Sequence, residues 1–146
     1  MLTHLLSPLV QDVSSHLKSS QELMHKINTL TRDQLLQYPY AFSLDVVALY
    51  TSIPPQEAIE SVKTRLNAHS FNYHGLKTEH IIKLLETVLK RRIFIFKNIL
   101  YEQKNGLAMG SRLSGFLATF VMDDLERRTI TADLQIGFYA RYVDDT

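Results

Sequence analysis

The 146-residue sequence contains no cysteine, only five glycines and four prolines, and no long uninterrupted apolar run. Without cysteine, the chain can form neither disulfides nor thiolate metal sites. Without about 20 consecutive apolar residues, it offers no candidate transmembrane helix. Lysine and arginine outnumber the acidic residues by one, 16 against 15, so the strongly basic balance of many nucleic-acid enzymes is also missing.

What remains is the composition of an ordinary globular protein, with 45% hydrophobic and 21% charged residues. A chain of this length can bury the core of one domain. The apolar stretch Leu5–Val10 is too short for the hydrophobic region of a signal peptide. We therefore expect a single intracellular domain with no membrane association. The sequence determines neither the compartment, nucleus or cytoplasm, nor the oligomeric state.

Apolar residues at helical spacing predict most of the secondary structure. Thr31 and Gln34 form a capping-box pair, and Pro54-Pro55 can open a helix because proline is tolerated in a first turn. The predicted helices cover 2–28 with a break near Pro8, 31–37, 55–66, 78–89 with Thr78 as the cap, and 112–128. The apolar residues at helical spacing are Val10, Val13, Leu17, Met24 and Ile27 in the first helix, Ala58, Ile59, Val62 and Leu66 in the third, and Ile81, Ile82, Leu85, Val88 and Leu89 in the fourth.

Three further stretches predict β-structure. The short apolar runs 41–47 and 136–140 are typical of buried strands, and 93–103 is typical of a hairpin that turns at Lys97-Asn98. Helices that alternate with a mainly antiparallel sheet indicate an α+β fold built in layers.

Acidic residues stand at the ends of both single strands. Asp45 lies near the end of 41–47, and Asp144 and Asp145 follow 136–140 closely. An acidic pair at a turn is usually only solvated, but two-metal phosphoryl transfer needs carboxylates from separate strands at one point. We therefore expect Asp45 and Asp144 to converge, although 99 positions separate them (144 − 45).

Three segments in this order resemble reverse transcriptases, most closely those of Penelope-like retroelements. The segments are Phe42–Asp45 through Tyr50–Pro54, Phe94–Gln103 through Gly106–Ser111, and Tyr142–Asp145. The resemblance extends over about residues 5–146. It implies an α+β fold that forms a partial right-hand polymerase palm with part of the fingers and no thumb, in one incomplete domain. Residues 1–40 would be an N-terminal helical segment, and 41–146 the palm and fingers.

The resemblance also implies an activity, which is RNA-directed DNA synthesis by nucleotidyl transfer. Asp45 and Asp144 would hold two Mg²⁺ ions roughly 3.5–4 Å apart, with Mn²⁺ as a possible substitute and Asp145 as a supporting carboxylate. The partners would be an RNA template, a DNA primer and deoxynucleoside triphosphates.

Three other residues would bind the nucleotide by the same resemblance. The Tyr50 ring would crowd a ribose 2′-hydroxyl, and Gly110 and Ser111 would let the backbone approach the template and the incoming nucleotide. The residues alone also allow simpler roles, with Tyr50 as a core side chain and Ser111 as a helix N-cap. Asp123 and Asp124, in the middle of the last helix, are expected at the surface.

The chain departs from the family pattern in two ways. Arg112 and Gly115 stand where the family usually has proline, and the basic fingers and the thumb have no counterpart in the sequence. We therefore expect no measurable polymerisation from residues 1–146 alone. Two alternatives stay open: a non-catalytic remnant that binds a nucleic acid or a protein, and a metal-dependent enzyme of another class. Tyr50 and Gly106–Ser111 argue against the second, because a generic metal hydrolase needs neither.

Overall fold

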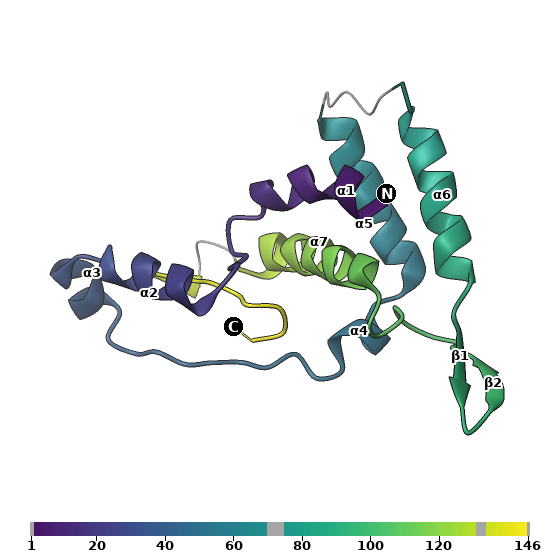
Figure 1. The fold of residues 1–146 in the computed structure, drawn as a ribbon. Helices are drawn as coiled ribbons and strands as arrows, with labels where there is room; N and C mark the ends of the chain where they lie inside the picture. The colour runs from purple at the N-terminus through teal and green to yellow at the C-terminus, as the bar shows by residue number, and fades with distance from the viewer. Residues whose placement is uncertain (1, 70–74, 131–133, 146) are drawn as a thin grey trace.

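A computed structural model describes residues 2–69, 75–130 and 134–145 (Figure 1). None of the helices in these ranges is long and apolar enough to cross a membrane. The elements are α1 (Leu2–Leu6), the 3₁₀ helix η1 (Ser7–Asp12), α2 (Ser20–Asn28), α3 (Arg32–Gln37), α4 (Leu49–Ser52), α5 (Pro55–Ala68), α6 (Thr78–Lys90), β1 (Ile93–Phe96), β2 (Ile99–Glu102) and α7 (Arg112–Thr129).

Helix α7 lies at the centre of the molecule. It packs against α5, α1, η1 and α4, and α6 packs against the other side of α5 (Figure 1). Ten of its side chains are buried, several of them polar. The apolar core that these helices share is made by Leu6, Leu9, Val13, Leu49, Ile53, Ala58, Ile59, Val62, Leu66, Ile81, Leu85, Leu89, Leu107, Leu113, Leu117, Ala118, Phe120, Val121 and Met122.

The helical predictions for α5 and α6 are confirmed. All four residues of the predicted α5 stripe are buried, and Pro55 occupies the first turn. In α6 the buried face is narrower than predicted, because Val88 is exposed and Ile82 is only half-buried. The N-cap of α6 is Lys77, one residue before the predicted Thr78.

The N-terminal helix is more interrupted than its periodicity predicts. Helix α1 ends at Leu6, Pro8 lies in the first turn of η1, and α2 begins only at Ser20. Met24 and Ile27, predicted to face the core, are exposed. Periodicity alone cannot tell whether a helix has a neighbour to pack against.

The capping box of α3 forms as predicted. The amide of Gln34 donates to Thr31 Oγ1 at 3.2 Å, and the amide of Thr31 donates to Gln34 Oε1 at 2.9 Å. Each side chain thereby satisfies an amide that the first turn of a helix leaves without a partner.

The predicted hairpin is confirmed, with β1 and β2 paired antiparallel from Ile93–Glu102 to Phe96–Ile99. Lys97 and Asn98 both adopt positive φ, as a two-residue hairpin turn requires. The two predicted single strands are wrong as stated. Residues 41–47 form no strand and are exposed apart from the half-buried Val46, with Phe42 at 75% exposure. Residues 136–140 form no strand either, and the pairing that follows them is limited to isolated bridges at Arg141, Tyr142 and Asp145. The predicted α+β class is confirmed, because the described part of the chain consists of helices and one antiparallel pair of strands.

Gly106 is where the loop after β2 comes into close contact with the backbone of α4. Its φ is +75°, and a Cβ at this position would come within 2.4 Å of the Thr51 backbone. Only glycine fits both conditions, because it lacks the Cβ and adopts positive φ without strain. Leu107, the next residue, is fully buried and donates its amide to the Tyr50 carbonyl at 2.7 Å.

We expect Gly106→Ala to lower the free energy of unfolding by about 2 kcal/mol or more, because the backbone of α4 would have to move. The control is Gly115→Ala in α7, where a Cβ meets open space. That change should stabilise the protein by about 0.5–1 kcal/mol through helix propensity. Urea unfolding followed by circular dichroism measures both. Equal effects of the two substitutions would contradict the close approach at Gly106.

Candidate functional site

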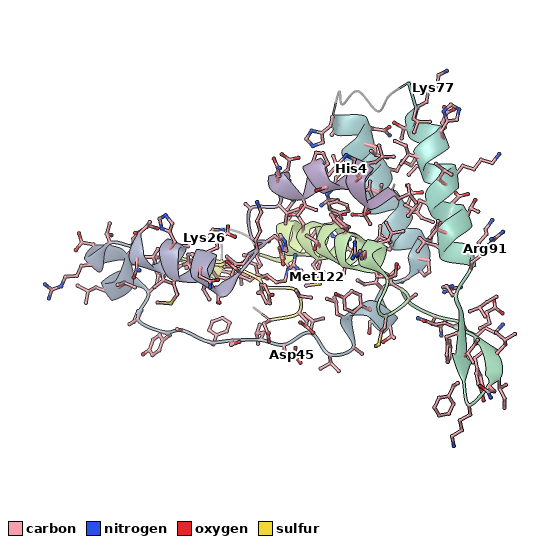
Figure 2. All side chains as sticks on the ribbon, in the orientation of Figure 1. His4, Lys26, Asp45, Lys77, Arg91 and Met122 are labelled. Atoms are coloured by element: carbon pink, nitrogen blue, oxygen red, sulfur yellow. The ribbon has the colours of Figure 1, made fainter. Side chains whose placement is uncertain are left out.

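The C-terminal acidic turn lies against the extended segment that carries Asp45. Asp45 and Asp145 form an isolated antiparallel bridge, and the Val46 amide donates to the Asp144 carbonyl at 3.0 Å. Figure 2 labels Asp45 on this segment, between α3 and α4. The two acidic segments that the sequence predicts to converge therefore meet through their backbones.

The acidic turn itself is a tight reversal closed by two backbone bonds. The Tyr142 amide donates to the Asp145 carbonyl at 2.7 Å, and the Asp145 amide donates to the Tyr142 carbonyl at 3.0 Å. Val143, inside the turn, has a φ of +58°, which a β-branched residue rarely adopts. Such backbone conformations cluster at functional sites, where the surroundings hold them in place. Asp144 is half-buried and Asp145 is exposed.

A buried polar network lies beneath the turn. Arg141 is 1% exposed, and its Nε donates to Glu126 Oε1 on α7. The same carboxylate accepts from Ser15 Oγ at 2.5 Å and from Tyr139 Oη at 3.1 Å. Burial and the nearby Arg141 cation lower the pKa of His16, so this imidazole is neutral at pH 7.

The three residues predicted to bind a nucleotide lie together. Tyr50, Gly110 and Ser111 line one open depression of about 450 Å³, with Met109, Arg112 and Gly115 completing the wall. Ser111 is the N-cap of α7, although its side chain makes no capping hydrogen bond. Gly110 has a φ of +79°, which explains the glycine at this turn.

A second cavity of about 210 Å³ extends from this depression towards the acidic turn. Tyr50, Arg112 and Gly115 line both cavities, and Val143 lines the second. Tyr50 therefore contributes to the walls of both the depression and the cavity that reaches the acidic turn. Tyr50 is half-buried and packs against the apolar core, so the same residue has a core contact and lines both cavities.

Hydrogen bonds fix the loop that carries the glycines. Arg92 Nη1 donates to the Gly106 carbonyl at 3.3 Å, and Gln103 Nε2 donates to the Leu107 carbonyl at 3.1 Å. Ser114 Oγ donates to the Ala108 carbonyl at 2.7 Å. The loop that leads into the wall of the depression is thus tied to the residues that flank the hairpin, Arg92 and Gln103, and to α7 through Ser114.

The carboxylates of Asp45, Asp144 and Asp145 have the chemistry that Mg²⁺ prefers, but they do not form a complete metal cage. In the part of the chain that the structure describes, no group of three histidine or acidic side chains gathers as a metal site. Mg²⁺ is usually bound through one or two carboxylates together with substrate phosphates. The structure brings the backbones of the Asp45 segment and the acidic turn together, and the binding of Mg²⁺ by the Asp45 and Asp144 carboxylates stays a prediction.

Sequence reasoning missed the residues that support the turn. Arg141 directly precedes Tyr142–Asp145, and Thr119, Asp123 and Glu126 recur at helical spacing along α7. A polar stripe on a helix that is apolar on its other faces is the signal that could have revealed them. The sequence predicts Asp123 at the surface, but this residue is 3% exposed, so that prediction is wrong.

Asp123 is buried because it is paired. Its carboxylate accepts from Arg65 Nη2 of α5 at 2.6 Å and from Arg127 Nε at 3.0 Å. The hydrogen bond and the charge of Asp123 raise the pKa of Arg127. Asp124 accepts from Ser61 Oγ at 2.5 Å and also pairs with Arg65. These contacts join α5 to α7.

The sequence matches no protein-family model and no curated protein. Among solved structures, the chain is similar to an apo telomerase from Candida tropicalis truncated from its C-terminal domain, with a TM-score of 0.78 and 16% sequence identity. The match covers 99% of this chain and 32% of the telomerase chain, so this chain spans about a third of that chain's length. The fold is therefore reverse-transcriptase-like, while the Penelope-like subgroup stays a prediction.

We expect Asp123→Ala to lower the free energy of unfolding by about 1.5–3 kcal/mol, because it removes one of the two carboxylates that pair with the largely buried Arg65 and leaves Asp124 as the other. The matched control is Glu60→Ala on α5, which breaks an exposed ion pair with Lys63. That change should stay within about 0.5 kcal/mol. Chemical denaturation measures both, and a loss below about 1 kcal/mol for Asp123→Ala would show that this pair is not needed.

Proposed function

We propose that the chain carries the catalytic centre of an RNA-directed DNA polymerase, of the kind found in Penelope-like retroelements. The observation that carries the proposal is the pairing of the Asp45 segment with the Tyr142–Asp145 turn, next to the depression lined by Tyr50, Gly110 and Ser111. The fold shared with a telomerase supports it, because a telomerase is a polymerase related to reverse transcriptases. Nucleotidyl transfer to a primer 3′-hydroxyl is the reaction that this set of groups could perform.

In this proposal Asp45 and Asp144 hold the divalent cations, and Asp145 supports them. Bound Mg²⁺ supplies charge that activates the attacking hydroxyl and stabilises the leaving pyrophosphate. The protein's part is to bring two carboxylates from distant segments to one place and to keep them oriented. The bond from Val46 to Asp144 and the closed acidic turn support that orientation.

The nucleotide would enter the depression beside Tyr50. Its wall combines a half-buried aromatic ring with the backbone of Gly110 and Ser111 and the side chain of Arg112. A ring that blocks the 2′ position would favour deoxynucleotides. Arg112, in place of the family's usual proline, adds a cation where phosphates could approach. The primer and the RNA template would lie along the same face.

A non-catalytic binding module is the alternative from a different class. The near-neutral charge of +1 favours it, because phosphate neutralisation drives most nucleic-acid affinity. The two functions differ in one measurable property, which is dependence on a divalent cation held by Asp45 and Asp144.

We expect the chain to bind Mn²⁺ together with a deoxynucleoside triphosphate, and Asp45→Asn or Asp144→Asn to weaken this binding about 100-fold or more. Each change removes a charged ligand, and the loss should exceed the roughly 10–100-fold that supporting residues around metals typically contribute. Isothermal titration calorimetry measures it without requiring turnover. Asp33→Asn, at an exposed position of α3, is the control and should bind as the wild type does. Nucleic-acid binding that ignores both the cation and these substitutions would favour the binding module.

We expect Tyr50→Ala to reduce the preference for deoxynucleotides over ribonucleotides by about tenfold, since shape discrimination of this kind is worth about 10–200-fold. The measured quantity is the ratio of the two dissociation constants in the presence of Mn²⁺. Tyr50→Phe keeps the ring and should keep the ratio. An unchanged ratio in Tyr50→Ala would return this residue to a core role.

A further inference from the structure

Arg141 is a fully buried cation directly before the acidic turn. A buried guanidinium is costly unless its charge is paired and its donors are satisfied. Here the charge is paired with Glu126, which is itself 7% exposed and also accepts from Ser15 and Tyr139. The guanidinium is therefore held in one orientation by a carboxylate on α7 that two other donors, Ser15 and Tyr139, also fix.

The other guanidinium nitrogens contact backbone carbonyls. Arg141 Nη1 donates to the Val143 carbonyl at 2.9 Å, and Nη2 reaches the Thr119 carbonyl of α7 at 3.4 Å. The Val143 carbonyl lies inside the acidic turn, at the residue whose φ is +58°. A rarely populated backbone conformation persists only where its surroundings determine it. The Arg141 bond to Val143 is one such determinant.

The backbone of Arg141 is anchored as well. Its amide donates to the Ser15 carbonyl at 2.8 Å, and its carbonyl accepts from the Leu17 amide at 2.8 Å. Side chain and backbone together connect the N-terminal segment, helix α7 and the acidic turn. A change at this one residue therefore acts on all three parts.

We propose that Arg141, anchored by Glu126, is a positioning residue that sets the acidic turn and thereby the orientation of Asp144 and Asp145 towards Asp45. The proposal rests on the proposed function, because the orientation matters only if these carboxylates bind cations. Arg141 is 1% exposed, lines the second cavity and directs its side-chain donors to Glu126, Val143 and Thr119, so in this proposal it acts through the turn rather than by ligating the cation. A lysine in its place would keep the charge but could not pair with Glu126 and bond to Val143 in the same planar geometry.

Arg141→Lys should weaken the binding of Mn²⁺ with a deoxynucleoside triphosphate by about tenfold, in the range seen for residues that support metal ligands. Arg128→Lys is the matched control, because Arg128 is exposed and its contacts within the described part of the chain are a 3.6 Å ion pair with Glu57 and a bond within α7. It should leave the affinity unchanged.

A second substitution separates positioning from general stabilisation. Glycine adopts positive φ without strain, so Val143→Gly should let the turn form without the arginine. We expect Arg141→Lys/Val143→Gly to recover at least half of the lost binding, on a logarithmic scale. If Arg141 only stabilised the core, Val143→Gly would recover nothing, and the proposal would be overturned.

NMR of the metal-free protein keeps this proposal distinct from the proposed function. Protection of the Val46 amide from exchange reports its bond to Asp144, and it should fall in Arg141→Lys and return in the double variant. If the wild type binds no Mn²⁺, the proposed function fails while this readout still tests the turn. Unchanged protection in Arg141→Lys would overturn the positioning role. If Arg141→Lys does not fold, Ser15→Ala takes its place, because it removes one of the bonds that hold Glu126. We then expect a smaller loss of protection at the Val46 amide, and Val143→Gly should restore that protection.

Discussion

Helix α7 is surrounded by other elements, so each charged side chain on its buried faces must find a partner. Asp123 finds Arg65 on α5, and Glu126 finds Arg141 in the C-terminal segment. A buried charge without a partner costs several kcal/mol, so these pairs fix how the neighbouring segments lie on the helix. Since the acidic turn follows Arg141 directly, its position depends on α7 through the pairing of Arg141 with Glu126.

The site is therefore assembled from long-range contacts rather than from one continuous sheet. The Asp45 segment is exposed along most of its length and meets the acidic turn through one bridge. The wall of the depression is held separately, by the bond from Leu107 to Tyr50 and by the close approach of Gly106 to Thr51. Both of these supports come from the glycine loop, and α4, which carries Tyr50, also packs against α7. Such an arrangement brings carboxylates and a nucleotide-sized depression together with little regular structure between them.

The sequence predicts the parts whose signals are local. Stripes at helical spacing identify α5 and α6, Thr31 with Gln34 identifies the start of α3, and Lys97-Asn98 identifies the hairpin turn. The meeting of the Asp45 segment with the acidic turn is also anticipated, from the chemistry that two acidic segments could share, and it is seen in their backbones, while convergence of the Asp45 and Asp144 carboxylates stays a prediction. The parts that the sequence does not predict depend on neighbours. An apolar run such as 41–47 becomes a buried strand only if other strands pair with it, and here its aromatic side chain stays exposed. Asp123 and Glu126 look like surface residues until α7 is known to be covered on those faces, and the metal site depends on substrate phosphates that the chain does not encode.

The most direct measurement of the central claim is anomalous diffraction from crystals of the protein grown with Mn²⁺ and a deoxynucleoside triphosphate. The account predicts an anomalous peak between the carboxylates of Asp45 and Asp144, with the triphosphate extending towards Tyr50 and Gly110. A triphosphate bound elsewhere, or manganese bound only at other acids such as Asp33, would contradict the assignment of the catalytic centre to Asp45 and the Tyr142–Asp145 turn.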